Sequence, residues 1–302
     1  MYSNTTGGGN SAYGFYTLNK NTTGVQNSAF GSSTLRNNIT GNDNSAFGYT
    51  SLNSNTTGSG NCAFGFFSLR FNTAGFNNTA YGYQSLLNNT GNYNTALGYN
   101  AGSTITTGAN LTCIGIDAAP SSPTAIDQVT LGNGFVNSLR CNVQTITSLS
   151  DARDKKNIKE LSLGLDFIAK LHPRQFNWDK REWYDDNVSE GSKMKEAPTA
   201  GFIAQELDDA QTTAGAEWLN LVLKDNPEKW EATYGNLLPV MVKAIQELKS
   251  EKDNEIAELK TENNELKDKL AKFEEMQNLL ALEVEKLRSI NSETKEIKLT
   301  EK

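Results

Sequence analysis

The segment NSAFGSSTLRNNITGND, residues 27–43, is one unit of the repeat that decides the fold of the N-terminal part of this 302-residue chain. Its first five residues follow the pattern Asn, small, Ala, aromatic, Gly, and the pattern recurs at an interval of 17 residues. Copies begin at Asn10, Asn27, Asn44, Asn61 and Asn78, then at Asn94 with Leu in the aromatic position, and a degenerate copy begins at Asn110. Such self-similarity indicates a stacked repeat architecture.

Turn sequences rich in Asn and Gly separate the copies, as in Asn-Thr-Thr-Gly at residues 21–24 and 55–58. Asn and Gly tolerate the left-handed backbone of tight corners. So short a unit buries a core only when copies stack, and we therefore predict a β-solenoid or β-roll over residues 1–118. The aromatic residue of each copy is expected in that core, rather than in a sugar-stacking ladder. Five other aromatic residues are candidates for exposure and binding: Phe15, Tyr16, Phe66, Phe67 and Tyr83.

The charge of the chain is spread unevenly. The net charge is −7 and the pI about 5.0, which argues against a nucleic-acid partner. Residues 1–140 carry four basic and three acidic side chains, leaving 24 and 32 for residues 141–302. This break predicts a domain boundary, with a β linker at 119–149 between the repeat and the charged C-terminal half. Alternation of polar and apolar residues from Gln128 to Leu149 predicts two or three strands in the linker.

Several classes of site are disfavoured by the sequence. No apolar run approaches the roughly 20 residues of a membrane span, so no membrane insertion is expected. The three cysteines, Cys62, Cys113 and Cys141, are widely spaced and predict neither a disulfide framework nor a metal site, which fits a reducing cytoplasm. No cofactor motif is present, because the glycines precede no Lys-Ser/Thr pair of a phosphate loop.

Residues 149–158 read LSDARDKKNI and join the two differently charged halves. This decamer resembles the start of the phage tail-fibre intramolecular chaperone, the self-cleaving peptidase family (peptidase S74) of endosialidase tailspikes. The resemblance implies that Ser150 is the nucleophile, that Lys155 is its base, and that the chain is cut between Leu149 and Ser150. Asp151, Arg153, Lys156 and Asn157 complete the motif.

The chemistry of such a pair constrains Lys155. A serine hydroxyl needs a base, and a lysine acts as one only when neutral, although its unperturbed pKa is near 10.4. Lowering that pKa by about 3 units corresponds to about 4 kcal/mol, which burial or nearby positive charge must supply. Asp154 opposes this, because a carboxylate beside Lys155 favours the charged amine. Residues five apart do not share a helix or strand face, so the two side chains meet across a turn or between chains.

The remaining sequence resembles the same family in several places. GFIAQEL at 201–207 matches a family motif at a strand-to-helix transition, where we interpret Gln205 and Glu206 as structural. An apolar pattern at 161–171 predicts a helix, residues 176–178 a strand and residues 182–196 a polar loop. His172, the single histidine, is interpreted as structural. These features place an α+β chaperone domain at 150–245.

Heptads begin at Leu238 and run towards the C-terminus, with d positions every seven residues through Leu287. Sustained apolar a and d positions predict an α-helical coiled coil at 246–302. The resemblance, rather than the heptads, implies that it is trimeric.

Taken together, the resemblance implies the C-terminal part of a homotrimeric phage tail fibre or tailspike, assembled in the host cytoplasm and destined for the virion. Its chaperone would fold the β-repeat fibre and cut itself free, and the mature fibre would bind a host cell-surface receptor or glycan. The alternative is a trimeric structural adhesin of a bacterial surface that does not cleave. A polysaccharide-cleaving enzyme is disfavoured, because residues 1–140 hold only three acidic groups.

Overall fold

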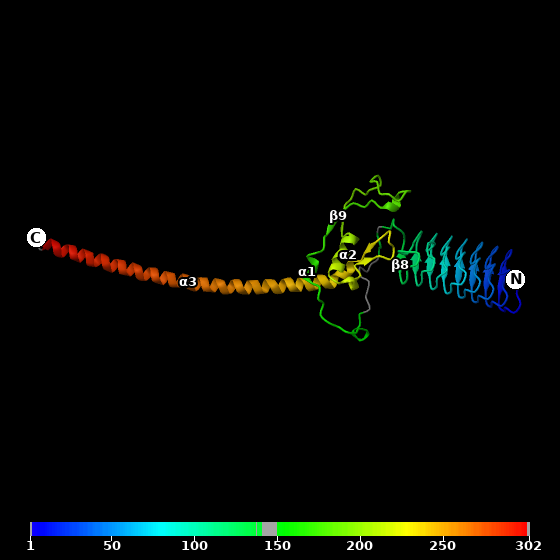
Figure 1. Ribbon diagram of the computed structural model, residues 1–302, viewed down its shortest axis with the longest axis horizontal. Coiled ribbons are helices and arrows are strands. Elements are labelled where there is room, and N and C mark those ends of the chain that lie inside the picture. Colours follow the sequence, from blue (N-terminus) through cyan, green and yellow to red (C-terminus); the bar gives the residue numbers. More distant parts are fainter. Residues whose placement is uncertain (1, 137, 141–149, 301–302) are drawn as a thin grey trace. The chain divides into compact units, whose positions relative to one another are not determined.

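The computed structural model describes residues 2–136, 138–140 and 150–300, with side chains through residue 290. It divides into two compact units (Figure 1). The first comprises Met1–Lys156 together with Leu223–Glu231, and the second comprises Asn157–Val222 together with Ala232–Lys302.

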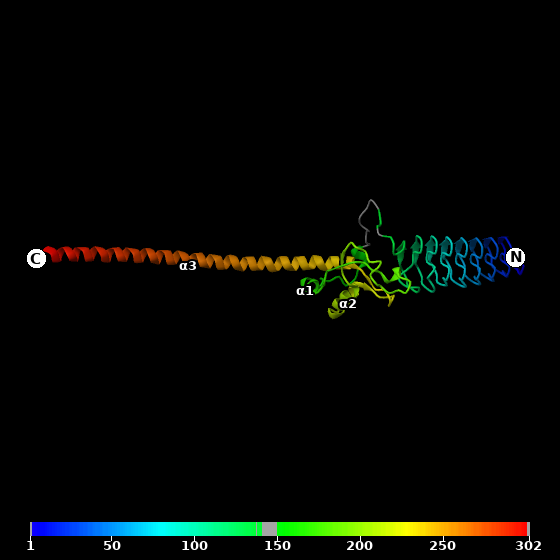
Figure 2. The same cartoon turned by 90° about the horizontal axis from the view of Figure 1, so that it is seen from above.

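The first unit is built on the predicted β-solenoid, whose coils stack one on the next (Figure 2). Each coil contributes one three-residue strand to a parallel sheet in which strands pair in sequence order. The strands are β1 Ser11–Tyr13, β2 Ser28–Phe30, β3 Ser45–Phe47, β4 Cys62–Phe64, β5 Thr79–Tyr81, β6 Thr95–Leu97, β7 Thr112–Ile114 and β8 Val129–Leu131. Equivalent residues pair, as Ala29 with Ala46 and Ala46 with Ala63, so the register of the sheet is the register of the repeat.

Alanine and leucine side chains fill the solenoid core. The central alanine of strands β2–β6 and a leucine from each early coil are fully buried, including Ala46 and Leu52. The prediction that the motif aromatics lie in the core is therefore wrong: Tyr13 is 76% and Tyr81 58% exposed. Successive strand residues point to opposite faces. Because alanine takes the inward position, the aromatic residue after it points outward.

Buried asparagines bind the coils to one another. The first residue of the motif is completely buried in the copies from Asn27 to Asn94, as at Asn44. The Nδ2 of Asn44 donates to Oδ1 of Asn27 (3.0 Å) and to the carbonyl of Gly58 (2.9 Å). A second buried column, at the turns, repeats the arrangement: Asn38 Nδ2 donates to Oδ1 of Asn21 at 2.8 Å. These side chains satisfy backbone groups that an apolar interior would leave without partners.

The predicted linker strands are described only in part. β8 is the last coil of the solenoid, and residues 138–140 form no strand. Most of the remaining prediction falls on residues 141–149, which lie outside the described residues.

The second unit is a small α+β region. Its elements are α1 Leu165–Ile168, β9 Arg174–Phe176, β10 Thr199–Gly201 and α2 Ala204–Thr213, with the 3-10 helices η2 Arg181–Trp183, η3 Glu217–Leu219 and η4 Tyr234–Leu237. β9 and β10 pair antiparallel, and β11 Val222–Leu223 pairs with β12 Glu231–Ala232. The predicted transition after Gly201 is confirmed, since β10 ends there and α2 begins three residues later.

The helix predicted over 161–171 is shorter than expected. It begins only after Gly164 and covers four residues, and the backbone N–H of Leu165 donates to Glu247 of the last helix at 2.7 Å. Glu247 thus takes one of the N-terminal donors of this helix, which the helix itself cannot pair.

The last helix, α3, spans Leu238–Thr300. Its apolar heptad residues are exposed in the single chain: Leu259 is 56% and Leu280 62% accessible. No helix among the described residues has a stretch long and apolar enough to span a bilayer.

Candidate functional site

A single 3-10 turn organises the start of the motif. This turn, η1, spans Ala152–Asp154, and the Asp151 carboxylate caps it by accepting from the backbone N–H of Arg153 at 2.9 Å. The same carboxylate forms an ion pair with the Arg153 guanidinium at 2.6 Å. These hydrogen bonds from Arg153 hold the pKa of Asp151 below its usual range. Asp151 therefore stays charged, and the turn stays capped, at any pH above that lowered pKa.

The turn brings Ser150 and Lys155 together. The Lys155 Nζ donates to Ser150 Oγ at 2.5 Å, within one chain and across η1. Contact across a turn is one of the two arrangements that the sequence leaves open, and the single described chain contains it. Both residues are exposed to solvent in the single chain.

The other motif residues differ in their contacts and exposure. Asp154 forms no ion pair with Lys155 in the part of the chain that the structure describes. The effect that the sequence predicts of Asp154 on Lys155 therefore does not arise from a direct contact. Lys156 is exposed, and Asn157 has a left-handed backbone (φ 54°) where the chain leaves the motif. Leu149 lies outside the described residues.

Gln205 and Glu206 lie in the second unit, on α2. Glu206 accepts a two-pronged contact from Arg174 of β9, with an ion-pair distance of 2.7 Å, and this contact lowers the pKa of Glu206. Gln205 and His172 are exposed. Glu206 thus ties β9 to α2, which fits a structural role.

Asp179 organises the polar loop predicted at residues 182–196. Its carboxylate accepts from the Tyr184 hydroxyl at 2.5 Å, from the Ser189 hydroxyl and from the Gly191 N–H at 2.9 Å. Hydrogen bonds from Ser189 and Tyr184 lower the pKa of Asp179. These partners follow Asp179 by five to twelve residues, and no periodic sequence pattern identifies them.

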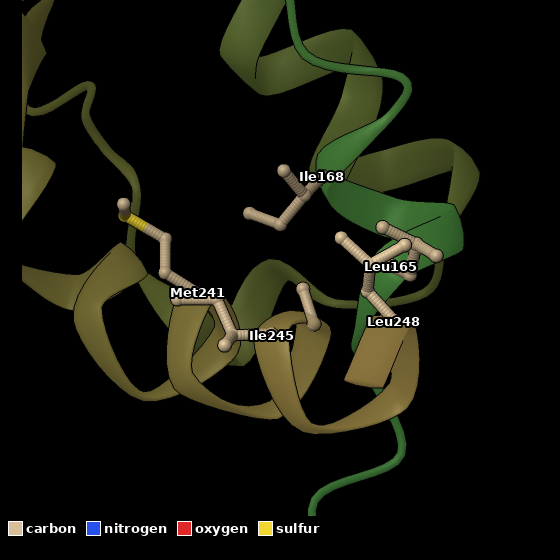
Figure 3. A pocket seen from close by; sticks show the side chains of 6 residues that line it. Leu165, Ile168, Met241, Ile245 and Leu248 are labelled. Carbon is tan, nitrogen blue, oxygen red and sulfur yellow. The ribbon is translucent and has the colours of Figure 1, made fainter. Parts of the chain in front are cut away.

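Two further features carry no catalytic chemistry. Burial raises the pKa of the Cys113 thiol to about 11, which keeps it protonated and inert in its core position. An apolar pocket of about 170 Å³ lies where α1 meets α3 (Figure 3). It is lined by Leu165, Ile168, Met241, Ala244, Ile245 and Leu248. Among the described residues, no cluster of His, Cys, Asp or Glu is arranged to hold a metal ion.

Comparison with known proteins gives one match. Residues 150–216 match the model of the peptidase S74 family, described as chaperone of endosialidase. The match begins at Ser150, contains η1 and runs just past α2. It confirms the family resemblance for this segment. No curated protein and no solved structure matches the chain.

Proposed function

We propose, from the chaperone-of-endosialidase segment at residues 150–216, that this chain is the C-terminal part of a homotrimeric phage tail fibre. Residues 150–302 bring three chains together, assist the solenoid to fold, and are then released by a cut between Leu149 and Ser150. The observation that carries the proposal is the contact of 2.5 Å between Lys155 Nζ and Ser150 Oγ at the first residue of the family match.

The position of the serine defines the chemistry. Ser150 lies on the leaving side of the bond, so its Oγ attacks the carbonyl carbon of Leu149 while the Lys155 amine takes the hydroxyl proton. The C–N bond then breaks, the Ser150 nitrogen receives a proton and becomes a free amine, and Leu149 becomes an ester on Oγ. Water hydrolyses that ester, giving a Leu149 carboxylate and regenerating the Ser150 hydroxyl. One chain is cut once.

The direction of the hydrogen bond separates resting and active states. A charged lysine donates to Oγ, whereas a base must accept the proton from Oγ. Both side chains are exposed to water in the single chain, and burial is what favours the neutral form of an amine. The apolar heptad residues of α3 are exposed as well. Assembly through α3 therefore comes first in our proposal, and cleavage follows when the assembled chains exclude water from the pair.

The test is the intact mass of the freshly expressed protein beside its Ser150→Ala variant. We expect the parent to yield two fragments, residues 1–149 and 150–302, and the variant to yield the uncut chain only. A parent that remains whole while sedimenting as three copies would reject the cleavage and support the alternative, a permanently attached structural adhesin.

A second prediction concerns the turn rather than the dyad. Asp151→Ala removes both the cap of η1 and the ion pair with Arg153. We expect cleavage to slow by roughly twofold to thirtyfold, which corresponds to the cost of about 0.5–2 kcal/mol for losing one capping residue. A time course of fragment formation measures it, with Glu160→Gln, an exposed acid outside the turn, as the matched control. Equal rates in parent and Asp151→Ala would show that the cap does not position the pair.

A further inference from the structure

Outward-facing apolar residues form a continuous stripe along the solenoid sheet. The third residue of every strand belongs to it, and we call this set the strand stripe. Its members are Tyr13, Phe30, Phe47, Phe64, Tyr81, Leu97, Ile114 and Leu131. Six of the eight are exposed and the other two are half-buried. The residues point away from the core because each comes directly after the inward-facing central residue of its strand.

A second stripe lies two residues later in each coil, and we call it the turn stripe. Its apolar members are Phe15, Tyr49, Phe66, Tyr83, Tyr99 and Ile116, all exposed. No charged residue occupies either stripe in the eight coils. The side chains that carry charge in the solenoid, such as Arg36 and Arg70, occupy other positions of the repeat.

The rings stack on one another from Phe30 to Tyr81 in the strand stripe and from Tyr49 to Tyr99 in the turn stripe. Phe30, Phe47 and Phe64 form a ladder with centroid separations of 4.8 and 4.7 Å and interplanar angles of 7°. In the turn stripe, Phe66, Tyr83 and Tyr99 stack at 5.4 and 5.1 Å. Stacking covers the ring faces and leaves their edges outward. Sugars stack on ring faces, so this geometry disfavours a glycan platform and favours packing against another apolar surface.

The size of the exposed surface indicates a macromolecular occupant. Twelve of these residues are 39–76% exposed. With roughly 150–250 Å² for an aromatic side chain, they present on the order of 1,000 Å² of mostly apolar surface. A stable interface needs about 800 Å² from each partner, and a typical monomer leaves a smaller patch uncovered.

We infer that the two stripes are the surface through which solenoids of neighbouring copies of this chain pack. Copies aligned by α3 present uncharged stripes with the same coil-to-coil spacing, so ring edges of one copy fit between coils of the next without repulsion. The inference rests on the proposed trimeric assembly and adds its contact surface along the fibre.

The test is thiol protection in the full-length chain. In a Ser150→Ala background with Cys62→Ser, Cys113→Ala and Cys141→Ser, single cysteines are introduced as Tyr81→Cys or Leu97→Cys in the strand stripe. Thr57→Cys, at an exposed turn outside both stripes, is the matched control. We expect maleimide to react at positions 81 and 97 at least roughly tenfold more slowly than at 57, because a buried thiol reacts only after local opening.

Sedimentation of the same samples separates the two proposals. Chains that sediment as three copies but react equally fast at all positions would overturn the stripe interface alone, leaving the stripes free for a soluble ligand. Chains that sediment as single copies would overturn both the interface and the trimeric assembly.

Discussion

Lys155→Ala is expected to leave the chain uncut over the time in which the parent is fully converted to fragments. Removing a positioned general base slows a proton-transfer step by about 10²–10⁴-fold. Lys155 is the amine that contacts Ser150 Oγ, at 2.5 Å, and the family match begins at that serine. Mass spectrometry of samples taken at intervals after expression measures the uncut fraction.

Two further variants sharpen this result. Lys159→Ala removes an exposed amine outside the motif and is expected to leave fragment formation within about twofold of the parent, as for a surface change away from the reacting atoms. Lys155→Arg keeps the charge but not the ability to become neutral, so it should remain uncut. Cleavage of Lys155→Ala at the parental rate would remove this lysine from the mechanism and reduce its contact with Ser150 to a structural hydrogen bond.

The solenoid can be predicted from sequence, because the period of the repeat is visible without any knowledge of contacts. Even so, the predicted inward position of the motif aromatics is wrong. The pattern shows that Ala46 and Phe47 alternate and predicts that the larger of the two points inward, whereas the coil has room only for alanine at this position, beside the buried leucines. Composition alone does not reveal the width of the interior. Because the interior accepts alanine at the central position of each strand, the aromatic residue that follows points outward and forms the strand stripe.

The site was readable only in part. Sequence restricted Ser150 and Lys155 to a turn or a contact between chains, but the turn itself depends on how Asp151 caps η1 and binds Arg153. Likewise, Glu206 was placed in a motif while its partner Arg174, 32 residues earlier, was not foreseen. Local periodicity carries no signal for such pairs, which form only after β9 and α2 are brought together.

Asn61→Ala is expected to destabilise the solenoid by roughly 3 kcal/mol or more, since each buried polar group left without a partner costs about 1–3 kcal/mol. Asn61 is fully buried. Its Nδ2 donates to Asn44 Oδ1 (3.1 Å) and to the Gly75 carbonyl (2.9 Å), and its Oδ1 accepts from the backbone N–H of Asn78 (3.0 Å). The variant therefore leaves buried groups of neighbouring coils without these partners.

The measurement is denaturant unfolding of the uncut Ser150→Ala chain, followed by the β signal in circular dichroism. Asn88→Ala is the matched control: Asn88 is exposed and its Nδ2 donates to the Ser103 carbonyl at 2.9 Å. Its loss should cost about 0.5 kcal/mol, as for an ordinary surface substitution. Equal midpoints for the two variants would contradict a dominant role for the buried column.

Asn61→Asp distinguishes hydrogen bonding from packing, because aspartate keeps the shape of asparagine and loses both Nδ2 donors. An oxygen then faces the Gly75 carbonyl and Asn44 Oδ1, and we expect destabilisation at least as large as for alanine. An amide both donates and accepts, so each asparagine of the column satisfies a coil above and a coil below. A leucine column would pack as well but would leave the glycine carbonyls without donors. This requirement explains why asparagine opens the motif in the six successive copies from Asn10 to Asn94.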